Sequence, residues 1–325
     1  GTDPSFAANI ALETAMPHEI AASLPARPEN SHKGSYGKAM IVAGSANYVG
    51  APRLAALAAY RVGTGLVTLG LPQSIHDIVA AGLTEPTFLL LSDDMGVLTP
   101  DAMDVLGEKL ANYDALLVGP GLGTETPTKH FIESLISGRS RSLRRPIGFA
   151  SAAGEGDAPL ALPPLIIDAD GLNLLSQSPE WHERLPEGSI LTPHPGEMAR
   201  LTGSKIATIN ADRVATAREY AKKWDCTIVL KGAFTVVANE KGQATVIPFA
   251  DPALATAGTG DVLAGAIVGL RAQGLDAYHA AITGAYLHAA ATQLRPAPNS
   301  AGMLASELLP LLPKAIQKLE KSCRR

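Results

Sequence analysis

A glycine-rich run that ends in a carboxylate is the strongest chemical signal in this chain. Residues 257–261 read Ala-Gly-Thr-Gly-Asp, and a small apolar run follows at 262–266. A glycine turn at the start of a helix leaves backbone N–H groups free, and the positive end of the helix dipole adds to their attraction for anions. Asp261 would then lie beside a bound phosphate, where its carboxylate can accept a proton from a substrate hydroxyl. The run therefore predicts phosphoryl chemistry.

A second signal is a histidine between two prolines. Residues 192–197 read Thr-Pro-His-Pro-Gly-Glu. Proline restricts the backbone, so the imidazole of His194 is expected to be held in place and to have a function, although a lone histidine is usually structural. Glu197 would begin the next helix, where its carboxylate can cap that helix or organise Mg²⁺ through water.

Acidic and amide side chains follow a short apolar run at 165–167. Residues 168–173 read Asp-Ala-Asp-Gly-Leu-Asn. Two carboxylates and an amide at the end of a strand suit polar recognition or the organisation of a metal ion. Asp170 can equally serve as the cap of the following helix. For Asn173, a functional role is only slightly favoured over a structural one.

Three further segments follow predicted strands, where ligands bind in open α/β sheets. Residues 44–52 (Gly-Ser-Ala-Asn-Tyr-Val-Gly-Ala-Pro) and 119–123 (Gly-Pro-Gly-Leu-Gly) are glycine-rich, so backbone can approach a ligand closely there. Residues 44–52 could instead be a flexible loop. Residues 119–123 form neither a Walker A motif nor a dinucleotide-binding fingerprint, and they could equally be an ordinary turn. Lys231 begins the third segment, 231–235 (Lys-Gly-Ala-Phe-Thr), and its ammonium can meet phosphate as a point charge.

The elements that must position these residues alternate between apolar strands and helical stretches. This alternation predicts βαβ units and a mostly parallel sheet with helices on both faces. A hairpin at 235–248 predicts an antiparallel edge. The predicted strands are 39–43, 66–69, 88–91, 115–118, 165–167, 190–191, 227–230, 235–238 and 244–248, and the predicted helices are 53–62, 102–110, 128–136, 211–224, 262–273, 277–294 and 304–319.

Bulk composition excludes several classes of protein. The chain has 325 residues, of which 46% are hydrophobic and 18% are charged, and its net charge is −4. A pI near 6.1 gives no basic surface for nucleic acid. No apolar run approaches the roughly 20 residues of a membrane span. Two scattered cysteines, Cys226 and Cys323, do not form a disulfide framework or a zinc site, so we expect a cytoplasmic protein.

The chain is expected to form one domain at 31–325 after a lead-in at 1–30. The lead-in should be poorly packed, with a short helix near 10–15. Residues 137–164 contain four arginines and lack the hydrophobic periodicity of a helix or a strand, so we expect an exposed loop there. His279 and His288 lie in an alanine-rich stretch and are expected to be core or surface residues rather than ligands.

Taken in order along the chain, these segments resemble the ADP/ATP-dependent NAD(P)H-hydrate dehydratases of the ribokinase-like superfamily. The resemblance covers residues 28–319 and rests on the strings at 33–37 (Lys-Gly-Ser-Tyr-Gly), 119–123, 168–173, 192–197, 231–232 and 257–261. It implies a three-layer α/β/α sandwich. It also implies repair of damaged nicotinamide cofactors: the nucleotide phosphorylates the hydroxyl of the (S)-hydrate, and phosphate then leaves to regenerate NADH or NADPH.

The resemblance also implies roles for individual residues. Asp261 would be the base, and the amides of Gly258, Thr259 and Gly260 would form the anion hole. Glu197 resembles the glutamate that organises Mg²⁺ in this superfamily. The substrate pocket would include Ala51, Gly121 or Gly123, Asn173, His194 and Asp261, and the adenine nucleotide would contact Lys231, Gly232, Ala233, Phe234, Thr235 and Gly260.

The partners implied are the hydrates NADHX and NADPHX, an adenine nucleotide, and a functional partner, NAD(P)H-hydrate epimerase. Bacterial relatives generally use ADP, whereas animal and fungal ones use ATP, and relatives are often tetramers. Three alternatives compete with this interpretation. A vitamin-precursor or sugar kinase of the same superfamily fits the 257–261 motif equally well, a nucleotide sensor would not need Asp261, and a dehydrogenase lacks its glycine fingerprint.

Overall fold

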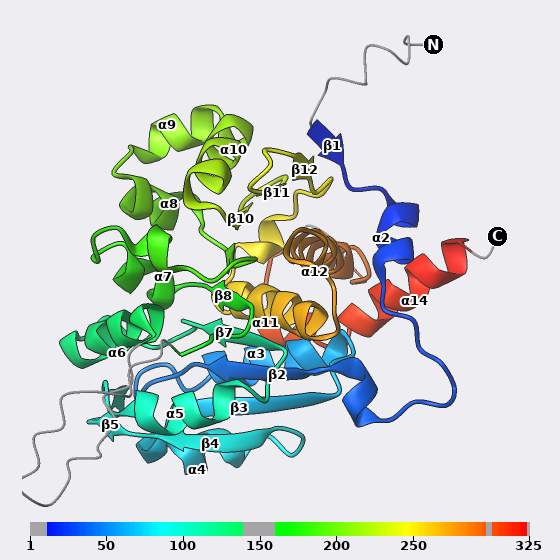
Figure 1. Ribbon diagram of the computed structural model, residues 1–325. Coiled ribbons are helices and arrows are strands. Elements are labelled where there is room, and N and C mark those ends of the chain that lie inside the picture. Colours follow the sequence, from blue (N-terminus) through cyan, green and yellow to red (C-terminus); the bar gives the residue numbers. More distant parts are fainter. Residues whose placement is uncertain (1–11, 139–159, 297–300, 324–325) are drawn as a thin grey trace, which may run out of the picture.

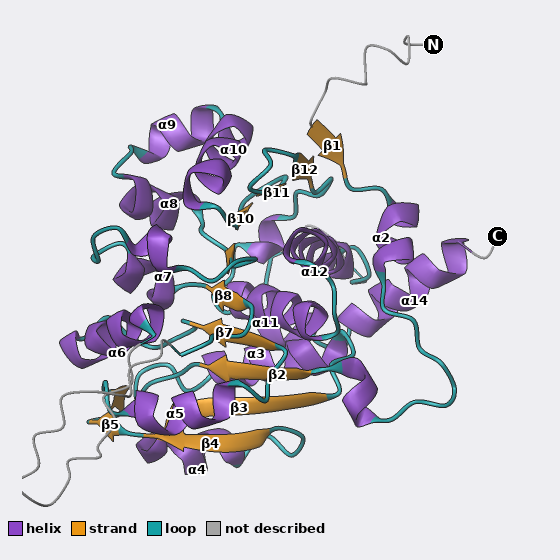
Figure 2. Cartoon of the chain, viewed as in Figure 1, coloured by secondary structure: helices purple, strands orange, loops and turns teal. Residues whose placement is uncertain are grey.

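The computed structural model describes residues 12–138, 160–296 and 301–323. A central sheet lies between two layers of helices (Figures 1 and 2). The strand order is β1-β12-β11-β10-β9-β8-β7-β2-β3-β4. The run from β10 to β4 is parallel, while β11 and β12 form the predicted antiparallel hairpin. The predicted fold class is confirmed: a ribokinase-like three-layer α/β/α sandwich, mostly parallel, with an antiparallel pair near one edge.

The strands of this sheet are short and mostly buried. Their bounds are β1 Leu12–Thr14, β2 Lys38–Val42, β3 Leu66–Pro72, β4 Thr87–Leu91, β7 Ala115–Val118, β8 Leu165–Ile167, β9 Ile190–Leu191, β10 Thr227–Leu230, β11 Val236–Ala238 and β12 Ala244–Val246. A separate small hairpin joins β5 (Asp93–Asp94) to β6 (Val97–Leu98).

Helices cover both faces, which explains why β7, β8, β9 and β10 read as continuous apolar runs. Along β2, Ala39 and Ile41 face one apolar cluster while Met40 and Val42 face the other. The helices are α2 Pro17–Ser23, α3 Ala51–Arg61, α4 His76–Ala80, α5 Ala102–Leu110, α6 Thr126–Ser137, α7 Asp170–Leu175, α8 Pro195–Thr202, α9 Ile206–Ala211, α10 Arg213–Trp224, α11 Thr259–Ala272, α12 Ala277–Thr292, α13 Ala305–Leu308 and α14 Leu312–Cys323.

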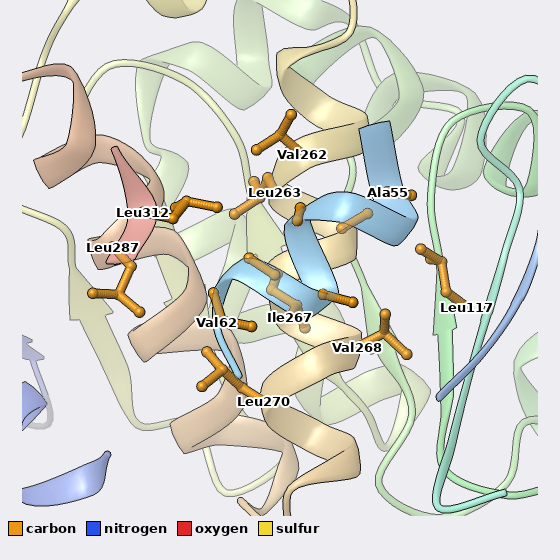
Figure 3. Packing of buried hydrophobic residues seen from close by; sticks show 14 of the residues in the cluster. Ala55, Val62, Leu117, Val262, Leu263, Ile267, Val268, Leu270, Leu287 and Leu312 are labelled. Atoms are coloured by element: carbon orange, nitrogen blue, oxygen red, sulfur yellow. The ribbon is translucent and has the colours of Figure 1, made fainter. Parts of the chain in front are cut away.

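Helix α11 lies at the centre of one of the two cores. It packs against α3, α12 and the sheet, and Figure 3 shows Val262, Ile267 and Val268 of α11 among side chains from these neighbours. The crossing with α3 is very close, because a Cβ added at Gly265 would lie 2.2 Å from the carbonyl oxygen of Ala55. Small residues at this crossing therefore hold α11 in place.

The prediction of a short helix near 10–15 in the N-terminal lead-in was wrong. Residues 12–14 form a strand that pairs in parallel with β12, and the helix of this region is α2, further along the chain. Ala15 and Ile20 are buried, 2% and 3% exposed, whereas residues 12–14 and 16–19 are exposed. This short segment has no strong hydrophobic periodicity. Its order is explained by its long-range contacts with β12, α12 and α14.

Several predicted helices have different ends. The predicted helix at 211–224 is divided by Asp212, whose carboxylate accepts a hydrogen bond from the Ala215 amide and caps α10. The predicted helix at 304–319 is two helices, α13 and α14. Helix α11 begins at Thr259, three residues before the predicted start, so Asp261 lies in its first turn.

Most of the segment predicted as an exposed loop, residues 139–159, lies outside the described residues, so that prediction stays a prediction. Within the described ranges, no helix has the length and apolarity that a membrane crossing requires.

Candidate active site

The carboxyl ends of three adjacent strands bring together the polar groups at the centre of the site. Asp168 directly follows β8, Thr192 follows β9 and Lys231 follows β10. The hydroxyl of Thr192 and the ammonium of Lys231 each donate a hydrogen bond to Oδ1 of Asp168, both at 2.7 Å. Because the carboxyl ends of parallel strands share one edge of the sheet, these residues meet although they are far apart in sequence.

Lys231 is surrounded by carboxylates. Its Nζ lies 2.7 Å from Asp168 and 3.5 Å from Oε2 of Glu197, and both acidic side chains are at most 5% exposed. Burial alone would lower the pKa of Lys231, but the charges of Asp168, Glu197 and Asp261 raise it. The lysine is therefore charged, and its ammonium is committed to balancing these carboxylates. Its predicted contact with nucleotide stays a prediction.

Asp261 adjoins this cluster from the first turn of α11. A Cβ added at Gly260 would lie 3.8 Å from Nζ of Lys231 and 3.9 Å from Oδ2 of Asp168, so the start of α11 contacts the cluster. Burial and then the charge of Asp168 raise the pKa of Asp261 to about 7, although Lys231 opposes the shift. A carboxylate with this pKa is suited to exchange a proton near neutral pH.

The turn before α11 contains the residues of the predicted anion hole, and that role stays a prediction. Gly258 has a φ of +88°, a left-handed conformation that favours glycine. The hydroxyl of Thr259 donates to the carbonyls of Leu254 and Thr256, which fixes the turn. The amide of Thr259 also donates to Thr256, at 3.3 Å. The amides of Gly258 and Gly260 make no hydrogen bond with other described residues and remain free for an anion.

His194 caps α8 and thereby fixes its own tautomer. Its Nδ1 accepts hydrogen bonds from the amides of Gly196 and Glu197, at 2.9 and 3.2 Å. Burial, Lys231 and Arg200 all lower the pKa of His194, so the ring is neutral near pH 7. A neutral imidazole whose Nδ1 accepts must carry its proton on Nε2. Nε2 lies 3.5 Å from Oε1 of Glu197, and because the side chain is half exposed it can also donate a hydrogen bond to a ligand.

The surroundings of Glu197 fit only a limited role with Mg²⁺. Its Oε2 accepts a hydrogen bond from the His194 amide at 2.7 Å and lies 3.5 Å from Lys231, and burial raises its pKa. The described residues contain no group of three or more side chains that could hold a metal ion. Mg²⁺ typically keeps several waters and binds through one or two carboxylates plus substrate phosphates. The site fits an ion held that way, with Glu197 as an outer partner.

The predicted substrate residues form two small groups. A Cβ added at Gly121 would lie 2.9 Å from Cβ of Ala51 and 2.6 Å from Cβ of Tyr48, so the two glycine-rich loops touch. Asp170 accepts a hydrogen bond from the Gly123 amide at 2.9 Å and one from Nδ2 of Asn173 at 3.4 Å. Asp170 thus connects a glycine loop to α7, which neither of its predicted roles described.

The predicted nucleotide loop turns away from the cluster after Lys231. Gly232, Ala233 and Phe234 are exposed, and Thr235 closes the turn by donating to the carbonyl of Gly232 at 3.0 Å. Phe234 has a φ of +54° and is 53% exposed. An aromatic residue in this conformation costs energy, and such outliers concentrate at ligand sites. The exposed turn is consistent with a nucleotide site beside the cluster.

Sequence reasoning missed Asp168, Thr192 and Arg200 as individual residues of the site. Asp168 and Thr192 lay in motifs already singled out, but the sequence alone could not show that their side chains meet. The string at 33–37, which contributed only to the resemblance, lies away from the site. It lies at the far end of α11 from Asp261, because a Cβ added at Gly37 would lie 1.9 Å from the carbonyl oxygen of Ala272.

Comparison with known proteins supplies the family. The sequence profile of the NAD(P)H-hydrate dehydratases matches residues 39–314. The ADP-dependent (S)-NAD(P)H-hydrate dehydratase of Neisseria meningitidis is 36% identical over 306 residues, which are 92% of this chain and 90% of that protein. A bifunctional NAD(P)H-hydrate repair enzyme of Moorella thermoacetica is 39% identical over 300 residues, and this chain spans about half (52%) of its length.

A solved structure agrees with the sequence matches. The ADP/ATP-dependent NAD(P)H-hydrate dehydratase of Bacillus subtilis, co-crystallised with ATP/Mg²⁺, aligns with a TM-score of 0.75 and 30% identity. The alignment covers 96% of this chain and all of that one. The profile covers most of the chain, and the Neisseria relative is matched along nearly its whole length. The chain therefore belongs to the NAD(P)H-hydrate dehydratase family.

Proposed function

We propose that this protein catalyses the nucleotide-dependent dehydration of (S)-NAD(P)H-hydrate to NAD(P)H. The observation that carries the proposal is Asp261, a carboxylate whose pKa is raised to about 7, beside the free amides of Gly258 and Gly260. The ionised Asp261 accepts the proton of the hydrate hydroxyl, and the hydroxyl oxygen attacks the terminal phosphoryl group. The amides donate to the phosphoryl oxygens as negative charge develops on them.

Elimination completes the reaction. The C–O bond of the phosphorylated hydrate breaks, inorganic phosphate leaves and a ring proton is lost, which restores the double bond of the reduced nicotinamide. With ADP as donor, each turnover yields one AMP, one phosphate and one NADH or NADPH. Mg²⁺, where bound, would neutralise charge on the nucleotide phosphates, and Glu197 would orient its waters.

Other parts of the proposal rest on the resemblance and on the relatives. ADP is the expected donor, in line with the name of the Neisseria relative, and ATP is the alternative. Bifunctional relatives support a functional partner, NAD(P)H-hydrate epimerase, that would supply the (S)-epimer. We also propose a cytoplasmic homo-oligomer, a tetramer, because the resemblance implies one and a reduced cytoplasm suits the free thiol of Cys226.

Product stoichiometry tests this proposal against a kinase of the same superfamily. The protein is incubated with NADHX, Mg²⁺ and ADP, and AMP, phosphate and NADH are quantified in one sample. We expect equal amounts of all three. A kinase would accumulate a phosphorylated product without releasing phosphate, and that result would overturn the dehydratase assignment.

A further inference from the structure

A chain of hydrogen bonds leads from the substrate loops to an arginine that has no assigned role. The amide of Gly123 donates to Oδ2 of Asp170 at 2.9 Å, and Nδ2 of Asn173 donates to Oδ1 of Asp170 at 3.4 Å. Nη1 of Arg200 then donates to Oδ1 of Asn173 at 2.8 Å. The chain joins the loop after β7 to α7 and α8, so Arg200 is held in place by residues that the resemblance assigns to the substrate.

The charge of Arg200 is not neutralised by this arrangement. Its acceptor, the amide oxygen of Asn173, carries no charge, and no carboxylate of the described residues lies within 4 Å of its guanidinium. The side chain is exposed. A guanidinium has five N–H donors in a planar fork that matches phosphate. Most of these donors therefore remain available to a ligand.

His194, which lies near Arg200, also offers a hydrogen-bond donor. Arg200 lies close enough to His194 for its charge to lower the pKa of the imidazole. Because Nδ1 of His194 accepts two backbone hydrogen bonds, the ring offers a donor, Nε2–H, and no acceptor. Nε2 of His194 lies 3.5 Å from Oε1 of the buried Glu197, so Arg200 is the group on this side of the predicted substrate pocket whose charge suits an anionic ligand.

We infer that Arg200 binds a phosphate group of the dinucleotide substrate. The inference rests on the proposed function, since the hydrate of NADH carries a pyrophosphate that must lie away from the reacting ring. Asn173 positions the guanidinium and Asp170 positions Asn173, so binding requires little ordering of the arginine. Arg200 would then set affinity for the whole dinucleotide while leaving the chemistry at Asp261 unchanged.

The direct test measures the Kd of NADH, the reaction product, by nicotinamide fluorescence, together with kcat and KM for NADHX. Arg200→Gln should raise both the Kd of NADH and the KM for NADHX roughly tenfold or more, the scale of one lost charge-assisted hydrogen bond. The kcat should change little. The variant should also weaken the salt dependence of NADH binding, and Arg200→Lys should restore part of the affinity.

Two controls separate binding from positioning. Arg61, at the end of α3, is exposed, and its side chain makes no hydrogen bond or ion pair with the other described residues, so Arg61→Gln should behave as wild type. Asn173→Ala keeps the charge of Arg200 and should therefore keep the salt dependence of NADH binding. An unchanged Kd in Arg200→Gln, or a wild-type salt dependence in that variant, would overturn the inference.

Different results would overturn the proposed function and the role of Arg200. Wild-type protein that regenerates no NADH from NADHX would remove the proposed function, and the inference with it. Wild-type protein that regenerates NADH, combined with an Arg200→Gln variant that binds NADH normally, would remove the inference alone.

Discussion

At the scale of single residues, the site concentrates negative charge that one lysine balances only in part. Asp168, Glu197 and Asp261 all act on the Lys231 ammonium. Two buried carboxylates and the partly buried Asp261 beside one cation favour retention of a proton, and burial raises the pKa of both Asp261 and Glu197. Asp261 is thereby kept as a weak acid that can become a base in the working pH range.

This arrangement predicts the pH dependence of the reaction. The base must be ionised, so kcat/KM should rise with pH through about 7 and then level off. The same raised pKa means that protonated Asp261 stabilises the fold, and this contribution is lost as pH rises through about 7. Initial rates measured across a pH series show the pH at which kcat/KM rises. An ascending limb near pH 4, the ordinary value for a carboxyl group, would contradict the account.

Asp261→Asn removes the proposed base but keeps the shape of the side chain. Activity should fall by about a hundredfold or more, the usual scale for a positioned base, while ADP still binds. Initial rates and calorimetric ADP titration measure the two effects. Near-normal turnover in this variant would show that another group takes the proton.

Lys231→Met tests the balancing role of the lysine. The change keeps the aliphatic stem and removes the cation that holds down the pKa of Asp261. The ascending limb of the pH profile should therefore move to higher pH, and nucleotide affinity should fall if the ammonium also reaches phosphate. The measurement is kcat/KM of the variant across the same pH series. If kcat/KM rises at the same pH as in the wild type, Lys231 does not have the balancing role.

At the scale of elements, the sequence indicated where the site would lie but not which side chains would meet. The strands at 165–167, 190–191 and 227–230 were predicted with the observed bounds, so their carboxyl ends were placed correctly. The sequence singled out Asp168 only as one of two carboxylates, left Asp170 equally open to a functional or a capping role, and slightly favoured a function for Asn173. Ala169 has a φ of +51°, a conformation that few non-glycine residues adopt, and this turn separates the directions of the two aspartates. No pattern in the sequence predicts such a turn.

The position of α11 depends on its close crossing with α3. Gly265→Ala would place a methyl group 2.2 Å from the Ala55 carbonyl oxygen, so the helices must separate. We expect a loss of about 1–3 kcal/mol in the free energy of unfolding and lower activity, because α11 carries Asp261. Gly107→Ala in α5 is the matched control, since its methyl would lie 3.6 Å from Leu160. Denaturant unfolding that ranks the two variants equally would refute the packing argument.

At the scale of the whole molecule, the fold class followed from the alternation of strands and helices, whereas the N-terminal segment did not. Residues 12–23 have little pattern of their own and are ordered by contacts with β12, α12 and α14, more than 200 residues away in sequence. Such long-range contacts are invisible to local propensity. For the same reason, the arginine at the end of the Gly123–Asp170–Asn173 chain emerged only from the structure.

The N-terminal segment is expected to contribute to the stability of the whole domain. Ile20 is 3% exposed in the core, so Ile20→Ala should lower the free energy of unfolding by about 2–5 kcal/mol. His18→Ala, on the exposed side of the same helix, should have little effect. Thermal unfolding of both variants provides the comparison, and equal melting temperatures would mean that residues 12–23 are indeed only a loosely attached lead-in.

The central claim is that this chain returns a hydrated nicotinamide to its reduced form at the expense of a nucleotide. The most direct measurement follows absorbance at the reduced-nicotinamide band after the protein is mixed with NADHX, Mg²⁺ and either ADP or ATP. The account predicts that absorbance recovers only when nucleotide is present, and that Asp261→Asn abolishes most of the recovery. Folded protein that gives no recovery with either nucleotide would contradict the account.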